Sequence, residues 1–286
     1  MERFDVAAGG LTFGAVATGE TDAPPALLLH GFPQTTRSWE PTMAALAAGG
    51  RRAVAFDQRG YSPGARPAAV EDYALERLVG DALAVADELG LDRFDLIGHD
   101  WGAIVAWVLA YEHPERVRTL TAVSVPHPRA FGAALVSHDS DQAERSSYIG
   151  VFRQPGGVAE QLLLGEDGSG AGLRLMFERS GLAPDSPAVD AFVAAMTRPG
   201  ALTAALNWYR AMSGDFGVGV GPVDVPTLFV WSPADIAVSR AAAEGNESWV
   251  TGPYRFEELD EAGHWIPERE PDVLAGMILD HVSAAS

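Results

Sequence analysis

The sequence contains no cysteine. This absence excludes disulfide frameworks, zinc sites built on thiolates and cysteine nucleophiles, and it leaves the redox compartment undefined. Positive charge is scarce as well, because 39 acidic residues outnumber 20 basic ones and give a formal net charge of -19 at pH 7. The excess of negative charge disfavours nucleic acid or an anionic membrane surface as a partner and favours a neutral or small substrate.

Long apolar runs are also missing. No stretch reaches the roughly 20 apolar residues that a membrane span needs, and the first residues lack the basic segment and apolar run of a signal peptide. We therefore expect a cytoplasmic protein without a membrane partner. A chain of 286 residues is long enough for one α/β domain of roughly 200 to 250 residues with a modest insertion. No oligomeric state is predicted.

Short apolar runs bounded by turn residues indicate buried parallel strands at 26–29, 53–56, 94–97, 120–125 and 227–231. Helical periodicity occupies intervals between them, at 73–89 and 102–111. A further strand-like run at 254–259 and a last helix at 272–281 complete the pattern. Strands that alternate with helices predict an α/β fold with a mostly parallel sheet.

The alternation is interrupted once. It stops near Pro126 and resumes at Pro226, and the intervening sequence has the character of helices and loops. We therefore predict a core formed by residues 1–126 and 222–286, with a helical cap of about ninety residues, 127–221, inserted into it.

A candidate nucleophile lies in the pentapeptide GHDWG at 98–102, between a predicted strand and a predicted helix. This is the context in which a G-x-S-x-G nucleophile elbow presents its central residue, which here is Asp100. A carboxylate needs no base to become nucleophilic, because its reference pKa of about 3.9 leaves it ionised at neutral pH. Alternatively, Asp100 only caps the following helix.

The tetrapeptide HGFP at 30–33 follows the first predicted strand. In α/β-hydrolases, a loop at this place contributes a backbone N–H to an oxyanion hole. The backbone N–H groups of Phe32 and Trp101 are the candidate donors. As a lone tetrapeptide, HGFP could instead be an ordinary turn.

Two further residues complete a hydrolytic set by their order in the chain. Asp235 follows the strand predicted at 227–231, and His264 follows the run at 254–259. Nucleophile, acid and histidine in this order match the α/β-hydrolase arrangement, in which the carboxylate orients the imidazole and the imidazole moves a proton. Taken singly, Asp235 would be a loop or cap residue and His264 a turn histidine.

These motifs resemble those of the epoxide hydrolases of the α/β-hydrolase superfamily, and the resemblance extends over nearly the whole chain. It is carried by HGFP with Trp39, by DQRGYS at 57–62 and by GHDWGA at 98–103. Two segments in the predicted cap, YIGVFRQPG at 148–156 and NWYR at 207–210, are similar to those in which the family carries its ring-opening tyrosines, here Tyr148 and Tyr209. Ser232 departs from the family, which usually has Gly there, and the polar tract 137–147 matches no known pattern.

The resemblance implies an α/β-hydrolase fold and the conversion of an epoxide to a vicinal diol through an ester on Asp100. Water activated by His264 would hydrolyse that ester, while Tyr148 and Tyr209 would polarise and protonate the epoxide oxygen. No metal or organic cofactor is required. A lipophilic or aryl epoxide is expected, because aromatic side chains are predicted to line the pocket, among them Phe152, Trp208 and Trp265.

Competing interpretations differ in chemistry. A haloalkane dehalogenase shares the aspartate nucleophile, but this chain has Phe32 where dehalogenases carry a halide-binding Asn. A fluoroacetate dehalogenase would have Arg in place of Trp101 to hold a carboxylate. A serine esterase or lactonase is disfavoured because Asp occupies position 100. A ligand-binding protein without catalysis is the alternative of another class, since fold alone does not establish function.

Overall fold

One mixed sheet organises the molecule. The computed structural model describes residues 1–212, 217 and 219–285, and its strands follow the order β1-β2-β4-β3-β5-β6-β7-β8. β3 to β8 are parallel, whereas β1 and β2 pair antiparallel, so the mostly parallel sheet predicted from the sequence is confirmed. The strands are β1 (Glu2–Ala8), β2 (Leu11–Thr18), β3 (Pro25–Leu29), β4 (Arg52–Phe56), β5 (Phe94–His99), β6 (Val117–Val123), β7 (Thr227–Trp231) and β8 (Tyr254–Glu258).

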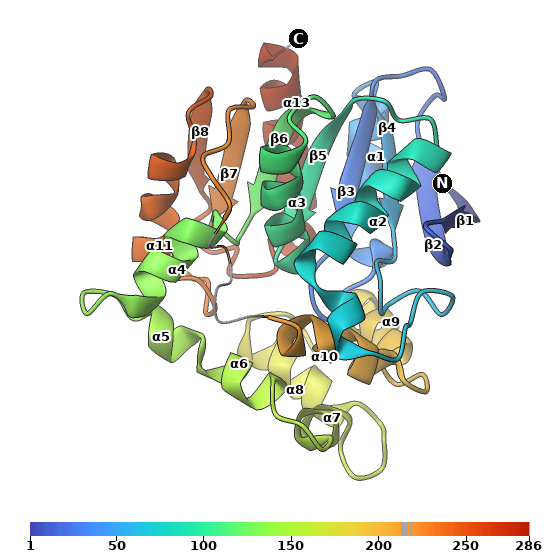
Figure 1. Cartoon of the computed structure of the whole chain (residues 1–286), viewed down its shortest axis with the longest axis vertical. Coiled ribbons are helices and arrows are strands. Elements are labelled where there is room, and N and C mark those ends of the chain that lie inside the picture. The colour runs from blue at the N-terminus through green and yellow to red at the C-terminus, as the bar shows by residue number, and fades with distance from the viewer. Residues whose placement is uncertain (213–216, 218, 286) are drawn as a thin grey trace.

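Helices cover both faces of the sheet (Figure 1). Alternate strand residues face opposite layers: Leu27 and Leu96 belong to one apolar core, and Leu28 and Ile97 belong to the other. The first core includes buried residues of α2 and α3, and the second those of α1 and α13. The bounds are α1 (Glu40–Ala48), α2 (Leu75–Glu88), α3 (Trp101–Glu112), α11 (Arg240–Glu244), α12 (Ile266–Arg269) and α13 (Pro271–Ala284), with 3-10 helices at Thr36–Trp39, Val70–Tyr73 and Gly245–Trp249.

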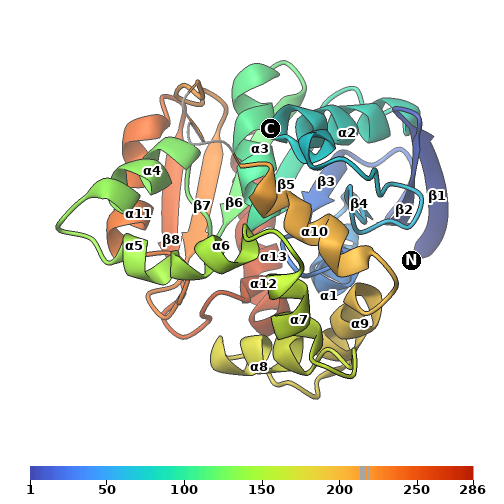
Figure 2. The same ribbon diagram turned by 60° about the horizontal axis from the view of Figure 1, so that its bottom comes forward.

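A run of helices separates β6 from β7 in the chain. It lies across the edge of the sheet where the parallel strands end, below the sheet in Figure 1 and toward the viewer in Figure 2. We call residues 127–221 the inserted helical segment; residues 213–216 and 218 of this range lie outside the described residues. Its helices are α4 (Pro128–Val136), α5 (Gln142–Arg145), α6 (Ser147–Phe152), α7 (Val158–Leu164), α8 (Ala171–Arg179), α9 (Pro187–Met196) and α10 (Ala201–Arg210).

Some predicted boundaries were wrong. The strand expected at 120–125 runs from Val117 to Val123, because Ser124 turns the chain with a φ of 67°. The helix expected at 73–89 begins at Leu75, since Ala74 is extended. The antiparallel pair β1 and β2 was not predicted at all.

Within the described residues, no helix is long and apolar enough to span a membrane. The cytoplasmic location stays a prediction.

Candidate active site

Asp100 lies at the sharp turn between β5 and α3. Its backbone has φ 53° and ψ -120°, a conformation that residues other than glycine rarely adopt. The turn is tight: a Cβ on Gly98 would lie 2.3 Å from the carbonyl oxygen of Gly102. The Asp100 side chain makes no capping hydrogen bond to α3. Hence the carboxylate is presented above the carboxyl end of the sheet, and the helix-cap alternative does not describe it.

The loop 30–33 reaches the Asp100 carboxylate with a backbone donor. The N–H of Phe32 donates to Asp100 Oδ1 at 2.7 Å. Gly31 permits this approach, because a Cβ there would lie 2.4 Å from Asp100 Cβ. His30 anchors the loop by accepting a hydrogen bond from the Gln58 backbone N–H at 3.1 Å, and the Gln58 side chain donates to the His30 carbonyl at 2.6 Å. The loop is therefore fixed to the segment that follows β4 rather than being a free turn.

The structure brings His264 between two carboxylates. Its Nδ1 lies 2.9 Å from Asp235 Oδ2 and 3.1 Å from Oδ1, and its Nε2 lies 3.6 Å from Asp100 Oδ2. Asp235 Oδ1 also accepts hydrogen bonds from the backbone N–H groups of Ala237 and Val238. All three ionisable side chains are buried. The imidazole is thus oriented by Asp235 and directed at Asp100.

Electrostatics favour a charged imidazole in this arrangement. Burial alone would lower the pKa of His264, but the carboxylates of Asp235 and Asp100 raise it to about 10. Burial would likewise raise the pKa of Asp100, whereas His264, His99 and the Phe32 N–H hold it below its ordinary value. The two carboxylates thus favour the protonated form of His264, and His264 in turn favours the ionised form of Asp100.

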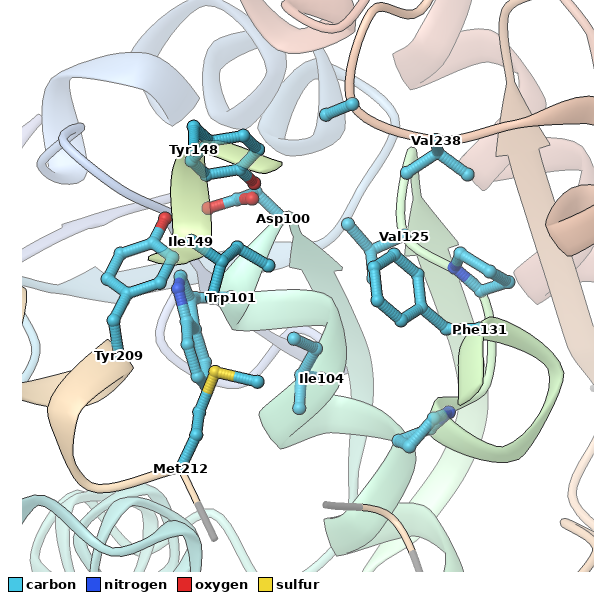
Figure 3. A pocket seen from close by; sticks show the side chains of 13 residues that line it. Asp100, Trp101, Ile104, Val125, Phe131, Tyr148, Ile149, Tyr209, Met212 and Val238 are labelled. Atoms are coloured by element: carbon cyan, nitrogen blue, oxygen red, sulfur yellow. The ribbon is translucent and has the colours of Figure 1, made fainter. Parts of the chain in front are cut away.

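Two tyrosines of the inserted helical segment face Asp100. Tyr148 lies on α6 and Tyr209 on α10, with ring centroids 6.3 Å apart. Figure 3 shows both hydroxyl groups turned toward the Asp100 carboxylate. Burial and the negative charge of Asp100 raise the pKa of Tyr148, and burial, Tyr148 and Asp100 raise that of Tyr209. Both hydroxyls therefore keep their protons at neutral pH and can act as donors.

Two cavities of unequal size meet at Asp100. The larger has a volume of about 380 Å³, and its lining includes Phe32, Phe152, His264 and Trp265. The smaller, shown in Figure 3, has about 40 Å³ and is lined mainly by apolar side chains. Both are also lined by Asp100, Tyr148, Tyr209 and Ala237. A molecule whose reacting atom lies between the tyrosines and Asp100 would extend into both cavities.

Comparison with known proteins agrees with this geometry. A family model described as α/β hydrolase fold matches residues 24–271. Epoxide hydrolase 3 of Xenopus tropicalis is 35% identical over 276 residues, which cover 95% of this chain and 74% of that protein. The chain belongs to the epoxide hydrolase family. Epoxide hydrolase A of Mycobacterium tuberculosis is 32% identical over 307 residues, covering 96% of this chain and 95% of that protein.

The fold of this member of the epoxide hydrolase family also resembles a solved structure over nearly the whole chain. The crystal structure of epoxide hydrolase A from Mycobacterium thermoresistibile superposes with a TM-score of 0.83 at 29% identity. The match covers 99% of this chain and 98% of that one. The inserted helical segment is therefore included in the shared fold, and the α/β-hydrolase fold predicted from the sequence is confirmed.

The aromatic residues predicted to line the pocket lie in different places. Phe152 and Trp265 line the larger cavity, and the Trp265 indole N–H donates to Ser180 Oγ at 2.7 Å. The ring of Trp208 instead packs against the ring of Trp101, and its indole N–H donates to the Arg59 carbonyl at 2.8 Å. In the described part of the chain, Trp208 lines neither cavity at Asp100, because this hydrogen bond turns its ring toward the core.

The polar tract 137–147 has a structural role that the sequence did not reveal. The Gln142 side chain donates to the Ala237 carbonyl at 2.7 Å and accepts from the Ser239 N–H at 2.8 Å. Arg145 donates to the backbone carbonyl of Asp235. The tract thus fixes the loop that carries Asp235, through contacts between residues about ninety positions apart in the chain, for which the sequence offers no local signal.

Further polar contacts hold the backbone around His264. Ser232 Oγ accepts from the Gly263 N–H at 2.9 Å, so the residue that departs from the family pattern joins the loops that carry Asp235 and His264. Ser124 Oγ donates to the His264 carbonyl at 2.9 Å, and His99 Nε2 lies 2.9 Å from the same oxygen. Within the described residues, no cluster of three or more acidic, histidine or cysteine side chains could hold a metal ion.

Proposed function

We propose that the protein hydrolyses epoxides to vicinal diols through a covalent ester on Asp100. The proposal rests on the position of the Asp100 carboxylate, which three kinds of group surround. A backbone N–H binds Oδ1, the imidazole of His264 faces Oδ2, and Tyr148 and Tyr209 face the carboxylate with protonated hydroxyls. Nucleophile, acid and base are thus present in one buried site. The names of the relatives support the same activity.

The first step would open the ring. The Tyr148 and Tyr209 hydroxyls donate hydrogen bonds to the epoxide oxygen, and Asp100 Oδ2 attacks a ring carbon because Oδ1 is engaged by Phe32. The bond between that carbon and oxygen breaks, its electron pair stays on the oxygen, and a tyrosine proton neutralises the alkoxide. General-acid assistance of this kind is typically worth about a hundred- to ten-thousand-fold in rate. The product is a hydroxyalkyl ester of Asp100.

The second step would hydrolyse the ester. Once Asp100 is esterified its negative charge is gone, which removes one cause of the high pKa of His264. The imidazolium then gives its proton to the tyrosinate left by ring opening, and the neutral imidazole takes a proton from water, whose oxygen attacks Asp100 Cγ. The oxyanion forms on Oδ1, where the Phe32 N–H already lies, with the Trp101 N–H as the second donor. Loss of one such donor typically costs about 2.7 to 4 kcal/mol of transition-state stabilisation. When the oxyanion collapses, the bond between Cγ and the ester oxygen breaks, the diol oxygen takes the proton held by His264, and the carboxylic acid formed on Asp100 returns a proton to His264.

The cavities indicate the substrate class. The larger cavity presents mostly apolar surface, including Phe152, Leu163 and Trp265, so burial of an apolar substituent would contribute about 25 cal/mol per Å². We therefore propose a lipophilic or aryl epoxide as substrate. In this proposal residues 127–221 form the cap that carries the tyrosines, and residues 1–126 and 222–286 form the core that carries the nucleophile, acid and base.

The activity is tested by incubating the purified protein with styrene oxide and, separately, with a bromoalkane. We expect diol formation and no bromide release. Asp100→Ala should abolish diol formation, because no nucleophile remains, whereas the control Asp139→Ala removes an exposed carboxylate and should leave activity intact. Bromide release without diol would identify a haloalkane dehalogenase, and binding of styrene oxide without turnover would identify a ligand-binding protein.

A further inference from the structure

Gln142 is a buried glutamine whose side-chain nitrogen and oxygen are both engaged in hydrogen bonds. It is the first residue of α5 and is 0% exposed. Its Nε2 donates to the Ala237 carbonyl at 2.7 Å and to Ser146 Oγ at 2.9 Å, and its Oε1 accepts from the Ser239 N–H at 2.8 Å. A buried amide with these partners favours one arrangement of the groups around it, because displacement would leave polar groups unpaired.

The hydrogen bonds of Gln142 reach two segments of the site. Two of its partners lie in residues 235–239, which we call the Asp235 loop. The third partner, Ser146, is the N-cap residue of α6 and lies two positions before Tyr148. One side chain therefore ties the loop that carries Asp235 to the start of the helix that carries Tyr148.

A second contact strengthens this connection. Arg145, the last residue of α5, donates to the backbone carbonyl of Asp235. On the side of the substrate, Tyr148 and Ala237 line both of the cavities that meet at Asp100. The Asp235 loop and α6 thus form two walls of the same site and are joined to each other through α5.

The two tyrosines are held in different ways. The Tyr209 ring packs edge-on against Phe32 and Trp101, which lie outside the inserted helical segment. The Tyr148 ring packs against Phe152 and Tyr209, which both belong to that segment. The polar contacts between α5 and the Asp235 loop therefore matter more for the position of Tyr148 than for that of Tyr209.

We infer that Gln142 is a positioning residue, which keeps the Tyr148 hydroxyl facing Asp100 by tying α6 to the Asp235 loop. This inference rests on the proposed epoxide hydrolysis, in which Tyr148 donates to the epoxide oxygen. A general acid must lie within hydrogen-bond distance of the atom that it protonates, and a displacement of about 1 Å can cost roughly a hundredfold in rate. Gln142 acts through Tyr148, since among the described residues it lines neither cavity at Asp100.

The test is a double-mutant cycle on ester formation from styrene oxide, measured by stopped flow. Gln142→Met keeps the length of the side chain but removes its hydrogen bonds, and should slow ester formation about ten- to a hundredfold. The loss should be at least as large in Tyr209→Phe, where Tyr148 is the remaining acid, but below about twofold in Tyr148→Phe, where no hydroxyl is left to position. The control Gln161→Met changes an exposed glutamine of α7 and should keep the wild-type rate.

Two further measurements separate positioning from a general weakening of the structure. Ser146→Ala removes one hydrogen bond of Gln142 and leaves the Asp235 loop paired, so it should slow ester formation by about two- to tenfold, again only when Tyr148 is present. Hydrolysis of the ester should slow less than its formation, because Asp235 keeps its contact with Arg145. Thermal unfolding shows whether each variant is folded, and Ser146→Ala decides the test if Gln142→Met is not.

Three results would overturn the inference. They are a loss of equal size in Tyr148→Phe, unchanged ester formation in the folded variants, and a larger effect on ester hydrolysis than on ester formation, which would assign the role of Gln142 to Asp235. Each of them leaves the epoxide hydrolase proposal intact, because the wild type still converts styrene oxide. A folded wild type that forms no diol from styrene oxide would overturn both.

Discussion

At the residue scale, the negative charge of Asp100 influences the pKa of several neighbouring side chains. It contributes to the high pKa of His264 and to the raised pKa of both tyrosines. These groups are coupled because they lie together in a buried site, where charges interact more strongly than in water. Esterification of Asp100 would therefore change the protonation of its neighbours in the direction that the second step requires.

Replacing Asp100 by Asn should lower the pKa of His264. Asparagine has a similar shape but no charge, so it removes one of the groups that raise this pKa to about 10 in the wild type. Titration of the His264 imidazole by NMR measures the change directly. The control Asp139→Asn removes an exposed carboxylate and should leave the titration as in the wild type. A pKa that remains near 10 in Asp100→Asn would contradict this coupling.

Replacing both tyrosines by Phe should remove the acid from ring opening. We expect Tyr148→Phe and Tyr209→Phe each to lower kcat/KM for an epoxide, and the double variant to lose about a hundred- to ten-thousand-fold. Tyr111→Phe is the matched control, because Tyr111 is 38% exposed on α3 and lines neither cavity at Asp100. Stopped-flow measurement of ester formation separates this step from hydrolysis. A double variant with wild-type ring opening would exclude the tyrosines as the acid.

A motif, or an order of motifs, was enough to predict three side chains that the structure brings together. Asp100 was predicted from the elbow pattern, and Asp235 and His264 from their order after it. Arg145 carries no such signal, since its contact with the Asp235 carbonyl depends on how α5 packs against a distant loop. Trp208 was predicted to line the pocket together with other aromatic residues, whereas the direction of its ring is set by the hydrogen bond to the Arg59 carbonyl.

At the scale of elements, the turn from β5 to α3 has strict steric and backbone requirements. Asp100 adopts a positive φ there, and the adjacent strand and helix leave no room for a side chain at Gly98. The elements that were predicted correctly are those with continuous apolar runs, such as β3 and β7. The pair β1 and β2 was missed because its partly exposed strands mix polar and apolar residues, and only the GG turn at 9–10 marks it.

A methyl group at Gly98 should disturb the turn. The added Cβ of Gly98→Ala would lie 2.3 Å from the Gly102 carbonyl, so we expect a loss of about 1 to 3 kcal/mol in the free energy of unfolding. Displacement of Asp100 should also lower kcat/KM by roughly a hundredfold. The control Gly80→Ala adds a methyl group in α2 with no atom within 4 Å and should stabilise by about 0.5 to 1 kcal/mol. Chemical denaturation measures the free energy of unfolding of both variants. A Gly98→Ala variant as stable as the wild type would refute the steric argument.

The whole molecule carries a net charge of -19, with 39 acidic residues against 20 basic ones. Repulsion among these charges opposes the compact state. It is strongest at low ionic strength, since the Debye length falls from about 30 Å at 0.01 M salt to about 8 Å at 0.15 M. Ion pairs such as Arg59 with Asp81 oppose this repulsion locally.

Salt should therefore stabilise the protein. Between about 0.01 M and 0.15 M sodium chloride we expect Tm at neutral pH to rise by about 2 to 4 °C, which corresponds to about 1 kcal/mol for a chain of this size. Scanning calorimetry in sodium and potassium chloride measures the shift and excludes a specific ion effect. A Tm that falls with salt would show that surface ion pairs outweigh the repulsion.

The covalent ester on Asp100 is the central claim, and one isotope measurement tests it most directly. Excess enzyme completes a single turnover of styrene oxide in oxygen-18 water, and peptide mass spectrometry then locates the label. The account predicts oxygen-18 in the peptide that contains Asp100 and none in the diol, because water attacks Cγ of the ester. Label in the diol of this first turnover, with none in the peptide, would show that water attacks the epoxide directly and would contradict the account.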